Sequence, residues 1–290
     1  MGLRMKFNLV LLAVILAGIG VTGWISHELL QRNARDEVVR NAELMMESTL
    51  AIRGYTVNQV APLLQLQLLR VFLPQSVPAY AATETINELR KKYPEYTYKE
   101  ATLNPTNPRD RTTDWEADLV HTFRNNADKK ELIGERDTPT GRTLYIARPL
   151  QIKSEACLVC HTVPSAAPAS MIKLYGEAHG FGWKMNEIIG AQVVSVPMSL
   201  PIKNAERAFA AFMASLFAVF AIVFIVLNLM LSWMIVRPIR TMSKVADQVS
   251  TGNFEMEEFS EHGKDEVAVL GASFNRMRRS LQKAMQMIES

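Results

Sequence analysis

Both cysteines of this 290-residue chain fall within one five-residue motif, Cys157-Leu158-Val159-Cys160-His161. Its C-x-x-C-H spacing is typical of c-type haem attachment. Two thiols about one helical turn apart can each form a thioether with a vinyl group on the same porphyrin edge, and the adjacent imidazole can then ligate the iron. The motif therefore predicts one covalently attached haem c, with Cys157 and Cys160 as attachment points and His161 as an axial ligand.

Two other chemistries use the same residue types. A structural zinc site requires four nitrogen or sulfur ligands, and the other histidine near the motif is His179. A redox-active or structural disulfide needs only the cysteine pair, but no thioredoxin-like pattern of strand and helix precedes it. The spacing with an adjacent histidine favours haem over both alternatives.

The second axial position of such an iron has several candidate ligands. A helical pattern runs from Ser26 to about Leu69 and places Met45 and Met46 on one face. That face comprises Val38, Ala42, Met45, Met46, Thr49, Arg53 and Val57. We expect Met46 or Met45 as the sixth ligand, although a methionine at helical spacing more often fills a core. The alternatives are an open sixth position or a ligand from Met171, Tyr175, His121 or His179.

A haem also carries two propionates. A partly buried carboxylate needs a fixed cation or a hydrogen-bond donor. Arg53, on the same helical face, and Tyr55, two residues later, are candidates for these roles. The alternative is an arginine whose aliphatic stem lies along the protein surface.

Two apolar blocks divide the chain. The first runs from about Phe7 to Ile25, and the second, from Ala208 to Val236, contains no charged residue. Each block is long enough to cross a bilayer, so we expect transmembrane helices at residues 7–29 and 207–236. A cleaved signal peptide is the alternative for the first block, but a convincing small-x-small cleavage site is missing and the helical pattern continues past it.

Basic residues at both ends predict the orientation. Arg4, Lys6, Arg237, Arg240 and Lys244 favour a cytoplasmic location for residues 1–6 and 237–290. Residues 30–206 then lie in the periplasm of a bacterium, on the outer side of its inner membrane. Haem attachment outside the cytoplasmic membrane is consistent with this two-pass topology.

The pattern of residues 30–206 predicts an α+β domain between the two membrane helices, with a PAS-like antiparallel sheet as the expected fold. Beyond the first helix, we expect helices and strands at these positions: helices at Ala81–Lys92 and Asp114–Asn125, and strands at Tyr96–Ala101, Glu131–Arg136, Thr143–Leu150 and Gly190–Met198.

The C-terminal segment has heptad spacing. Its apolar positions are Ile239, Met242, Ala246 and Val249, then Val267, Leu270, Phe274, Met277, Leu281, Ala284 and Ile288, with a break at Gly252. Such a seam suits a parallel bundle of helices from two chains. With Pro238 at the membrane exit and Asp265-Glu266 before the second run, the segment resembles a HAMP domain, whose members form dimeric four-helix bundles. An anonymous amphipathic tail is the alternative.

Several short patches in residues 35–200 resemble the Tll0287-like family. They are Arg53-Gly54-Tyr55-Thr56, Asn104-Pro105-Thr106-Asn107-Pro108, Arg148-Pro149-Leu150, Gly180-Phe181-Gly182-Trp183, Gly190-Ala191 and Val196-Pro197-Met198. The resemblance implies a c-type haem protein with a PAS-like fold that acts as a bacterial sensor module. Because both cysteines lie in the haem motif, neither remains to serve as a thiolate ligand of the iron.

A net charge of +3 with interspersed signs gives no basic stripe, which excludes nucleic acid as a partner. The leading hypothesis is a homodimeric membrane haem sensor that is not itself an enzyme. It would respond to redox state or to a diatomic gas ligand and signal through HAMP to a cytoplasmic partner such as a kinase or cyclase. A membrane-anchored monohaem cytochrome for electron transfer and a haem-independent chemoreceptor are the alternatives.

Overall fold

The computed structural model describes residues 2–139, 141–255, 258–259 and 265–289. The chain divides into two compact units. Residues 28–208 form an α+β unit, and residues 1–27 together with 209–290 form a helical unit. The mixture of helix with a small antiparallel sheet confirms the predicted α+β class.

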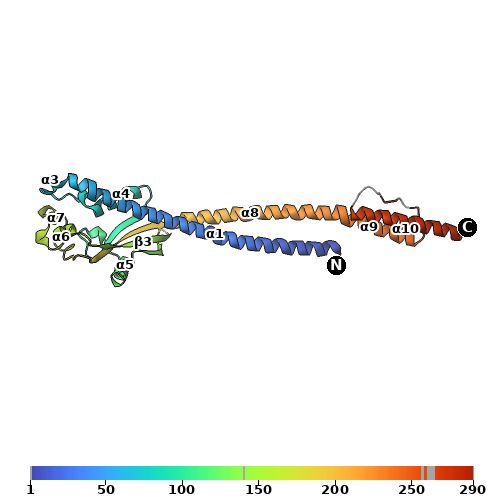
Figure 1. Ribbon diagram of the computed structural model, residues 1–290, viewed down its shortest axis with the longest axis horizontal. Helices are drawn as coiled ribbons and strands as arrows, with labels where there is room; N and C mark the ends of the chain where they lie inside the picture. The colour runs from blue at the N-terminus through green and yellow to red at the C-terminus, as the bar shows by residue number, and fades with distance from the viewer. Residues whose placement is uncertain (1, 140, 256–257, 260–264, 290) are drawn as a thin grey trace. The chain divides into compact units, whose positions relative to one another are not determined.

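The α+β unit, which contains the strand β3 and the helices α5, α6 and α7 labelled in Figure 1, is built on a four-stranded sheet with the strand order β1-β4-β3-β2. Its strands are β1 (Thr97–Thr102), β2 (Leu132–Thr138), β3 (Gly141–Gln151) and β4 (Ile188–Pro197). Every neighbouring pair is antiparallel. All four strands lie within a few residues of their predicted positions.

Helices and short helical turns surround this sheet. They are α1 (Leu3–Tyr55), η1 (Thr56–Val60), α2 (Ala61–Leu63), α3 (Gln65–Leu68), η2 (Pro74–Ser76), α4 (Pro78–Arg90), η3 (Pro108–Asp110), α5 (Asp114–Asn125), α6 (Glu155–His161), η4 (Pro164–Ala166) and α7 (Ala169–Tyr175). Helix α5 has the predicted bounds, and a capping box at Thr113 and Glu116 explains its sharp start.

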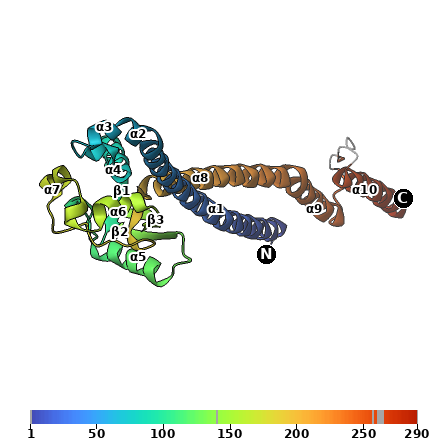
Figure 2. The same cartoon turned by 60° about the vertical axis from the view of Figure 1, so that its left-hand side comes forward.

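The sheet buries both of its faces, because successive side chains of a strand point to opposite sides. On one face, Leu144, Ile146 and Val194 pack against α1 and α4. On the other face, Ala147 and Val193 pack against α5. Figure 2 shows α5 and α1 on opposite sides of the strands. The resulting three layers hold the N-terminal helix against the sheet.

Helix α1 buries most of the predicted face. Val38, Ala42, Met46 and Thr49 are fully buried. Val57 was predicted on this face, but it is 51% exposed. The reason is the π-helical turn η1, in which the Ala61 N–H donates to the Thr56 carbonyl oxygen five residues earlier. Val57 lies inside this wider turn, which changes the angle between successive side chains and so takes Val57 off the buried face.

The helical unit contains α8 (Ser199–Met230), η5 (Leu231–Val236), α9 (Arg237–Ser250) and α10 (Glu266–Glu289), of which the first residues of α8 belong to the α+β unit. Two helices, Arg4–Leu63 and Ser199–Ser250, are long and apolar enough to cross a membrane. Within this unit, Met213 approaches Gly23, and the rings of His27 and Phe209 lie 5.3 Å apart. The exact span limits 7–29 and 207–236 remain predictions.

The C-terminal helices separate where predicted. Helix α9 ends at Ser250, and Gly252 follows with a φ of +90° that favours glycine. Asn275 of α10 is buried, and its side-chain amide bonds both the N–H and the carbonyl oxygen of Phe259, at 3.0 and 2.9 Å. The heptad residues Leu270, Met277 and Leu281 are about half exposed in the single chain. The side chain of Ile288 lies outside the described residues.

Candidate functional site

The two cysteines and His161 all lie on the short helix α6. Ser154 caps this helix, because its hydroxyl accepts a hydrogen bond from the Ala156 N–H at 3.3 Å. Cys157 and Cys160 are free thiols and are each half-buried. Their spacing of three residues places both thiols on one side of the helix. The structure thus brings the predicted attachment points and the predicted axial ligand together.

The imidazole of His161 is held by contacts with three residues. Its Nδ1 lies 2.7 Å from the carbonyl oxygen of Gly180 and, more distantly, 3.4 Å from the Thr106 hydroxyl, and its ring stacks on Trp183 with centroids 3.9 Å apart. A carbonyl oxygen can only accept, so Nδ1 must carry the proton. The lone pair of a neutral ring is then on Nε2, which is the arrangement found in metal-ligating histidines.

Burial also favours the neutral form of His161. Loss of hydration lowers the pKa of this imidazole, and the hydrogen bond to Gly180 opposes that shift only in part. A neutral imidazole is the form that ligates a metal.

The loop behind His161 is held by backbone and amide contacts. Asn104 accepts from the Gly180 N–H at 3.1 Å and donates to the Phe181 carbonyl oxygen at 3.0 Å. Gly182 and Trp183 donate their N–H groups to the carbonyl oxygens of Thr162 and His161. Residues from two of the short family patches, Asn104–Pro108 and Gly180–Trp183, therefore surround the predicted iron ligand.

Gly180 is required at its position. Its φ is +83°, and a Cβ there would overlap the side chain and the Cα atom of Thr106. Sequence reasoning did not assign Asn104, Thr106, Gly180 or Trp183 to the site. The glycines of Gly180-Phe181-Gly182-Trp183 were the available signal, since clustered glycines mark a tight backbone approach.

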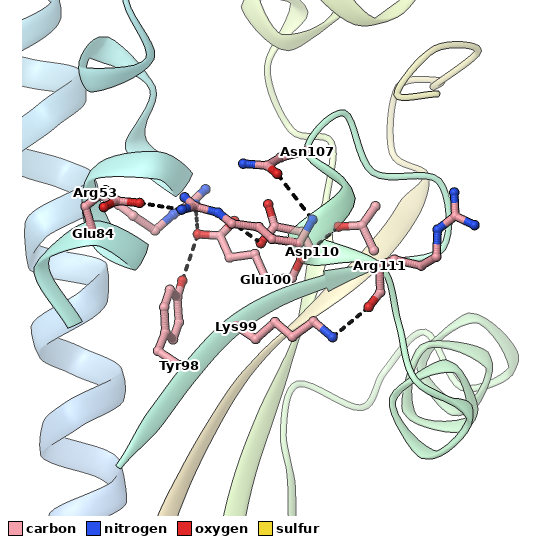
Figure 3. A network of polar contacts seen from close by, with 10 residues as sticks. Arg53, Glu84, Tyr98, Lys99, Glu100, Asn107, Asp110 and Arg111 are labelled. Carbon is pink, nitrogen blue, oxygen red and sulfur yellow. Dashed lines mark hydrogen bonds and ion pairs between the residues drawn. The ribbon is translucent and has the colours of Figure 1, made fainter. Parts of the chain in front are cut away.

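Arg53 lies in a buried polar network between α1 and β1 (Figure 3). Its guanidinium forms an ion pair with Glu100, which also accepts a hydrogen bond from the Tyr98 hydroxyl at 2.7 Å. Gln192 donates to the same hydroxyl at 3.2 Å. Sequence reasoning missed Tyr98, Glu100 and Gln192, although polar residues within apolar strands are an available signal.

Burial lowers the pKa of Arg53, but the Glu100 carboxylate, together with smaller contributions from other neighbours, more than offsets this effect, so the pKa of Arg53 is raised. Burial, together with Glu100, raises the pKa of Tyr98, so its hydroxyl stays protonated and donates. The ion pair between Arg53 and Glu100 therefore links α1 to β1 through charged partners.

The other predicted residues lie in an apolar cluster or at the end of α1. Met46 is fully buried and Met45 is 8% exposed, and both pack in the apolar cluster with Leu144 and Val194. Tyr55, at the end of α1, is 57% exposed. The roles of Met45 and Met46 as iron ligands, and of Arg53 and Tyr55 as propionate partners, stay predictions.

The other candidate ligands lie in different surroundings. Met171 is buried in α7, His179 Nε2 lies 3.0 Å from Arg111 Nη2, and Tyr175 packs edge-on against Phe72. His121 lies on α5, whose inward face instead buries Leu119, Val120 and Phe123. Their roles as iron ligands stay predictions.

The residues present fit a haem. The buried indole N–H of Trp183, next to His161, has no hydrogen-bond partner among the described residues and could donate to a carboxylate. Val159 and Val163, within and just after the motif, are 64% and 50% exposed, so apolar surface is available near α6. Thiols, a neutral imidazole, apolar surface and an unpaired donor are the groups that a covalently attached porphyrin requires.

Two regions of the chain are similar to known protein families. A model of the Tll0287-like family matches residues 31–197, and a model of the HAMP domain matches residues 230–283. No curated protein matches the chain. The crystal structure of the cyanobacterial heme-protein Tll0287 is similar, with 16% identity over 56% of this chain and 95% of that chain and a TM-score of 0.44. Because the first match covers more than half of its 290 residues, the chain belongs to the Tll0287-like family, and it carries a C-terminal HAMP domain.

Proposed function

We propose that this protein is a transmembrane c-type haem sensor that relays a conformational signal through its HAMP domain. The observation that carries the proposal is the geometry at His161. Its Nδ1 is committed to Gly180, so Nε2 remains for a metal, two thiols at the attachment spacing lie on the same short helix, and the family match includes this whole segment.

The chain's own residues would hold one haem c in stated roles. Cys157 and Cys160 would form the thioethers, His161 would ligate the iron, and Trp183 and Arg53 are the donors available to propionates. Bound haem would supply an iron that changes its redox state or binds a diatomic gas. Met46 or Met45 remains the proposed sixth ligand, with an open position as the alternative.

Two connections support transmission from this site. The ion pair between Arg53 and Glu100 joins β1 to α1, which continues toward the first apolar segment. Strand β4 ends at Pro197, and α8 begins two residues later, at Ser199. A shift at the haem motif can therefore reach either helix. It can bias HAMP packing only by the free-energy difference that the iron's state imposes on the two packings.

We further propose a homodimer in the bacterial inner membrane, with the α+β unit in the periplasm. Exposed Leu270, Met277 and Leu281 repeat at spacings of seven and four residues on α10, as expected for a seam that a second chain covers. The positions of Arg4, Lys6 and Arg237 support a cytoplasmic HAMP domain. The signal would pass to a separate kinase or cyclase, and the protein itself would not be an enzyme.

Cross-linking in membranes tests the proposal. With both native cysteines bonded to haem, a cysteine introduced by Leu281→Cys is the sole free thiol, and Lys283→Cys on the same helix is the matched control. We expect bismaleimide cross-linking at position 281, little at 283, and a yield at 281 that changes when the haem is reduced or binds CO or NO. A yield indifferent to redox state and gas would favour an electron-transfer cytochrome. Signalling retained in a Cys157→Ala/Cys160→Ala variant would favour a haem-independent receptor.

A further inference from the structure

A cavity of about 480 Å³ lies in the α+β unit, beside the edge strand β1. Among its lining residues are Thr97, Lys99, Trp115, Arg136, Val193 and Ser195. Asn87 and Arg90 of α4 also line it. The volume falls within the range of small-molecule sites, roughly 300–1,000 Å³. None of its lining residues belongs to α6, so this cavity is distinct from the haem motif.

The acidic residues of the cavity are already engaged. Glu116 accepts hydrogen bonds from the Thr113 N–H and hydroxyl and pairs with Lys99 at 2.7 Å. Lys99 also donates to the Arg111 carbonyl oxygen at 2.6 Å. Burial raises the pKa of Asp110 to about 6, so this carboxyl carries less than a full charge in mildly acidic solution. The carboxylates present therefore leave positive charge uncompensated.

Two guanidinium groups supply that positive charge. Arg90 and Arg136 form no ion pair with any of the described carboxylates. Arg136 lies over the ring of Trp115, with its Cζ atom 4.1 Å from the centroid. Stacking holds the planar group in place while leaving its N–H groups available. A fixed guanidinium binds a carboxylate through two parallel hydrogen bonds.

The remaining lining suits the body of a small organic molecule. Trp115, which is partly buried, offers aromatic surface at the cavity. Thr97 and Ser195 are register partners on β1 and β4, and their hydroxyls have no hydrogen-bond partner among the described residues. Apolar walls with a few unpaired polar groups are the usual composition of a ligand pocket.

We propose that this cavity binds a small organic carboxylate, with Arg136 holding the carboxylate and Trp115 contacting its carbon skeleton. Such a ligand would be a second input to the same α+β unit, because Tyr98 lines the cavity and bonds to Glu100. Binding does not depend on haem, so this proposal can fail or succeed independently of the proposed function.

Isothermal titration of the full-length, haem-loaded protein with benzoate and with succinate tests the proposal. We expect at least one of them to bind, and benzamide, succinamide and inorganic phosphate to bind at least about tenfold more weakly. Arg136→Gln should weaken carboxylate binding by at least about tenfold, and Arg136→Lys should weaken it less. Arg142→Gln, on the same hairpin but outside the cavity, is the matched control and should leave binding unchanged.

Three results would overturn the proposal. The first is that neither carboxylate binds at millimolar concentration. The second is equal affinity of the wild-type and Arg136→Gln proteins while the melting temperature shows that both are folded. The third is binding of phosphate with no binding of either carboxylate. Repeating the titration with the Cys157→Ala/Cys160→Ala protein should give the same affinity, which separates this site from the haem.

Discussion

The Nδ1 atom of His161 lies 2.7 Å from the carbonyl oxygen of Gly180, and this hydrogen bond orients the imidazole of the haem motif. The loop can make it only because residue 180 has no side chain. A Cβ at this position would overlap Thr106, and the φ of +83° disfavours any other residue. Gly182 has a similar φ of +81°, but a Cβ there would meet no atom within 4 Å.

Comparing Gly180→Ala with Gly182→Ala therefore separates the effect of the clash with Thr106 from the effect of a positive φ. Both substitutions cost about 1–3 kcal/mol for the positive φ, but only the first must also displace Thr106. We expect Gly180→Ala to lower the melting temperature of the full-length protein by several degrees more than Gly182→Ala. It should also alter the absorption spectrum of the haem through the His161 orientation. Equal effects of the two substitutions would contradict the proposed role of this contact.

The buried ion pair between Arg53 and Glu100 should be sensitive to loss of either partner. The side chains are 24% and 4% exposed, so Glu100→Gln leaves a largely buried guanidinium without its counter-charge. Such losses cost about 3–5 kcal/mol. We expect a matching fall in thermal stability, with Arg53→Met/Glu100→Gln less destabilised than the sum of the single variants. Glu88→Gln, which breaks the exposed pair with Lys91, should cost under about 1 kcal/mol.

Asp110 gives a pH prediction with a defined sign. Burial raises its pKa from 3.8 to about 6 in the folded protein. Below pH 3.8, the carboxyl is protonated in both the folded and the unfolded protein, so its burial does not disfavour folding. As the pH rises from about 4 to about 6, the carboxyl ionises more readily in the unfolded protein, so the free energy of unfolding falls. Asp110→Asn should therefore stabilise the protein at pH 7, by at most about 3 kcal/mol, and have little effect at pH 3.5. A benefit that is independent of pH between 3.5 and 7 would contradict this explanation.

Asn275 anchors the connector of the HAMP domain through two hydrogen bonds to Phe259. The residue is 1% exposed, so Asn275→Ala removes the partners of two part-buried backbone groups of Phe259. The cost is at most about 1–3 kcal/mol for each group, because water can reach part of them. We expect weaker cross-linking at position 281 and loss of its dependence on haem state. Ser273→Ala, at a partly buried position of the same helix whose side chain forms no hydrogen bond with Phe259, is the control and should preserve both.

Much of the fold could be predicted because the signals are periodic and local. The strands alternate in polarity, α5 has a capping box, and the buried face of α1 follows the 3.6-residue repeat as far as Arg53. Val57 was misplaced because a π-helical turn changes that repeat. The pattern of apolar residues alone does not encode such a turn.

Only part of the candidate site could be predicted from the sequence. The C-x-x-C-H motif is contiguous, so its spacing alone predicts c-type haem attachment. The groups that position His161 come from residues 57 and 19 positions away in the chain, at Asn104 and Gly180, and only the fold brings them together. The sixth ligand could not be deduced for a related reason, since a core methionine such as Met46 and a ligating one share the same helical spacing.

Intact mass measurement of the full-length protein, produced alongside a working haem-attachment system, tests the central claim most directly. If one haem is covalently attached, we expect a mass increased by one haem, a porphyrin absorption spectrum that survives denaturation, and loss of both in the Cys157→Ala/Cys160→Ala variant. His161→Ala should keep the added mass but change the spectrum. A colourless protein with the mass of the bare polypeptide would contradict covalent haem attachment.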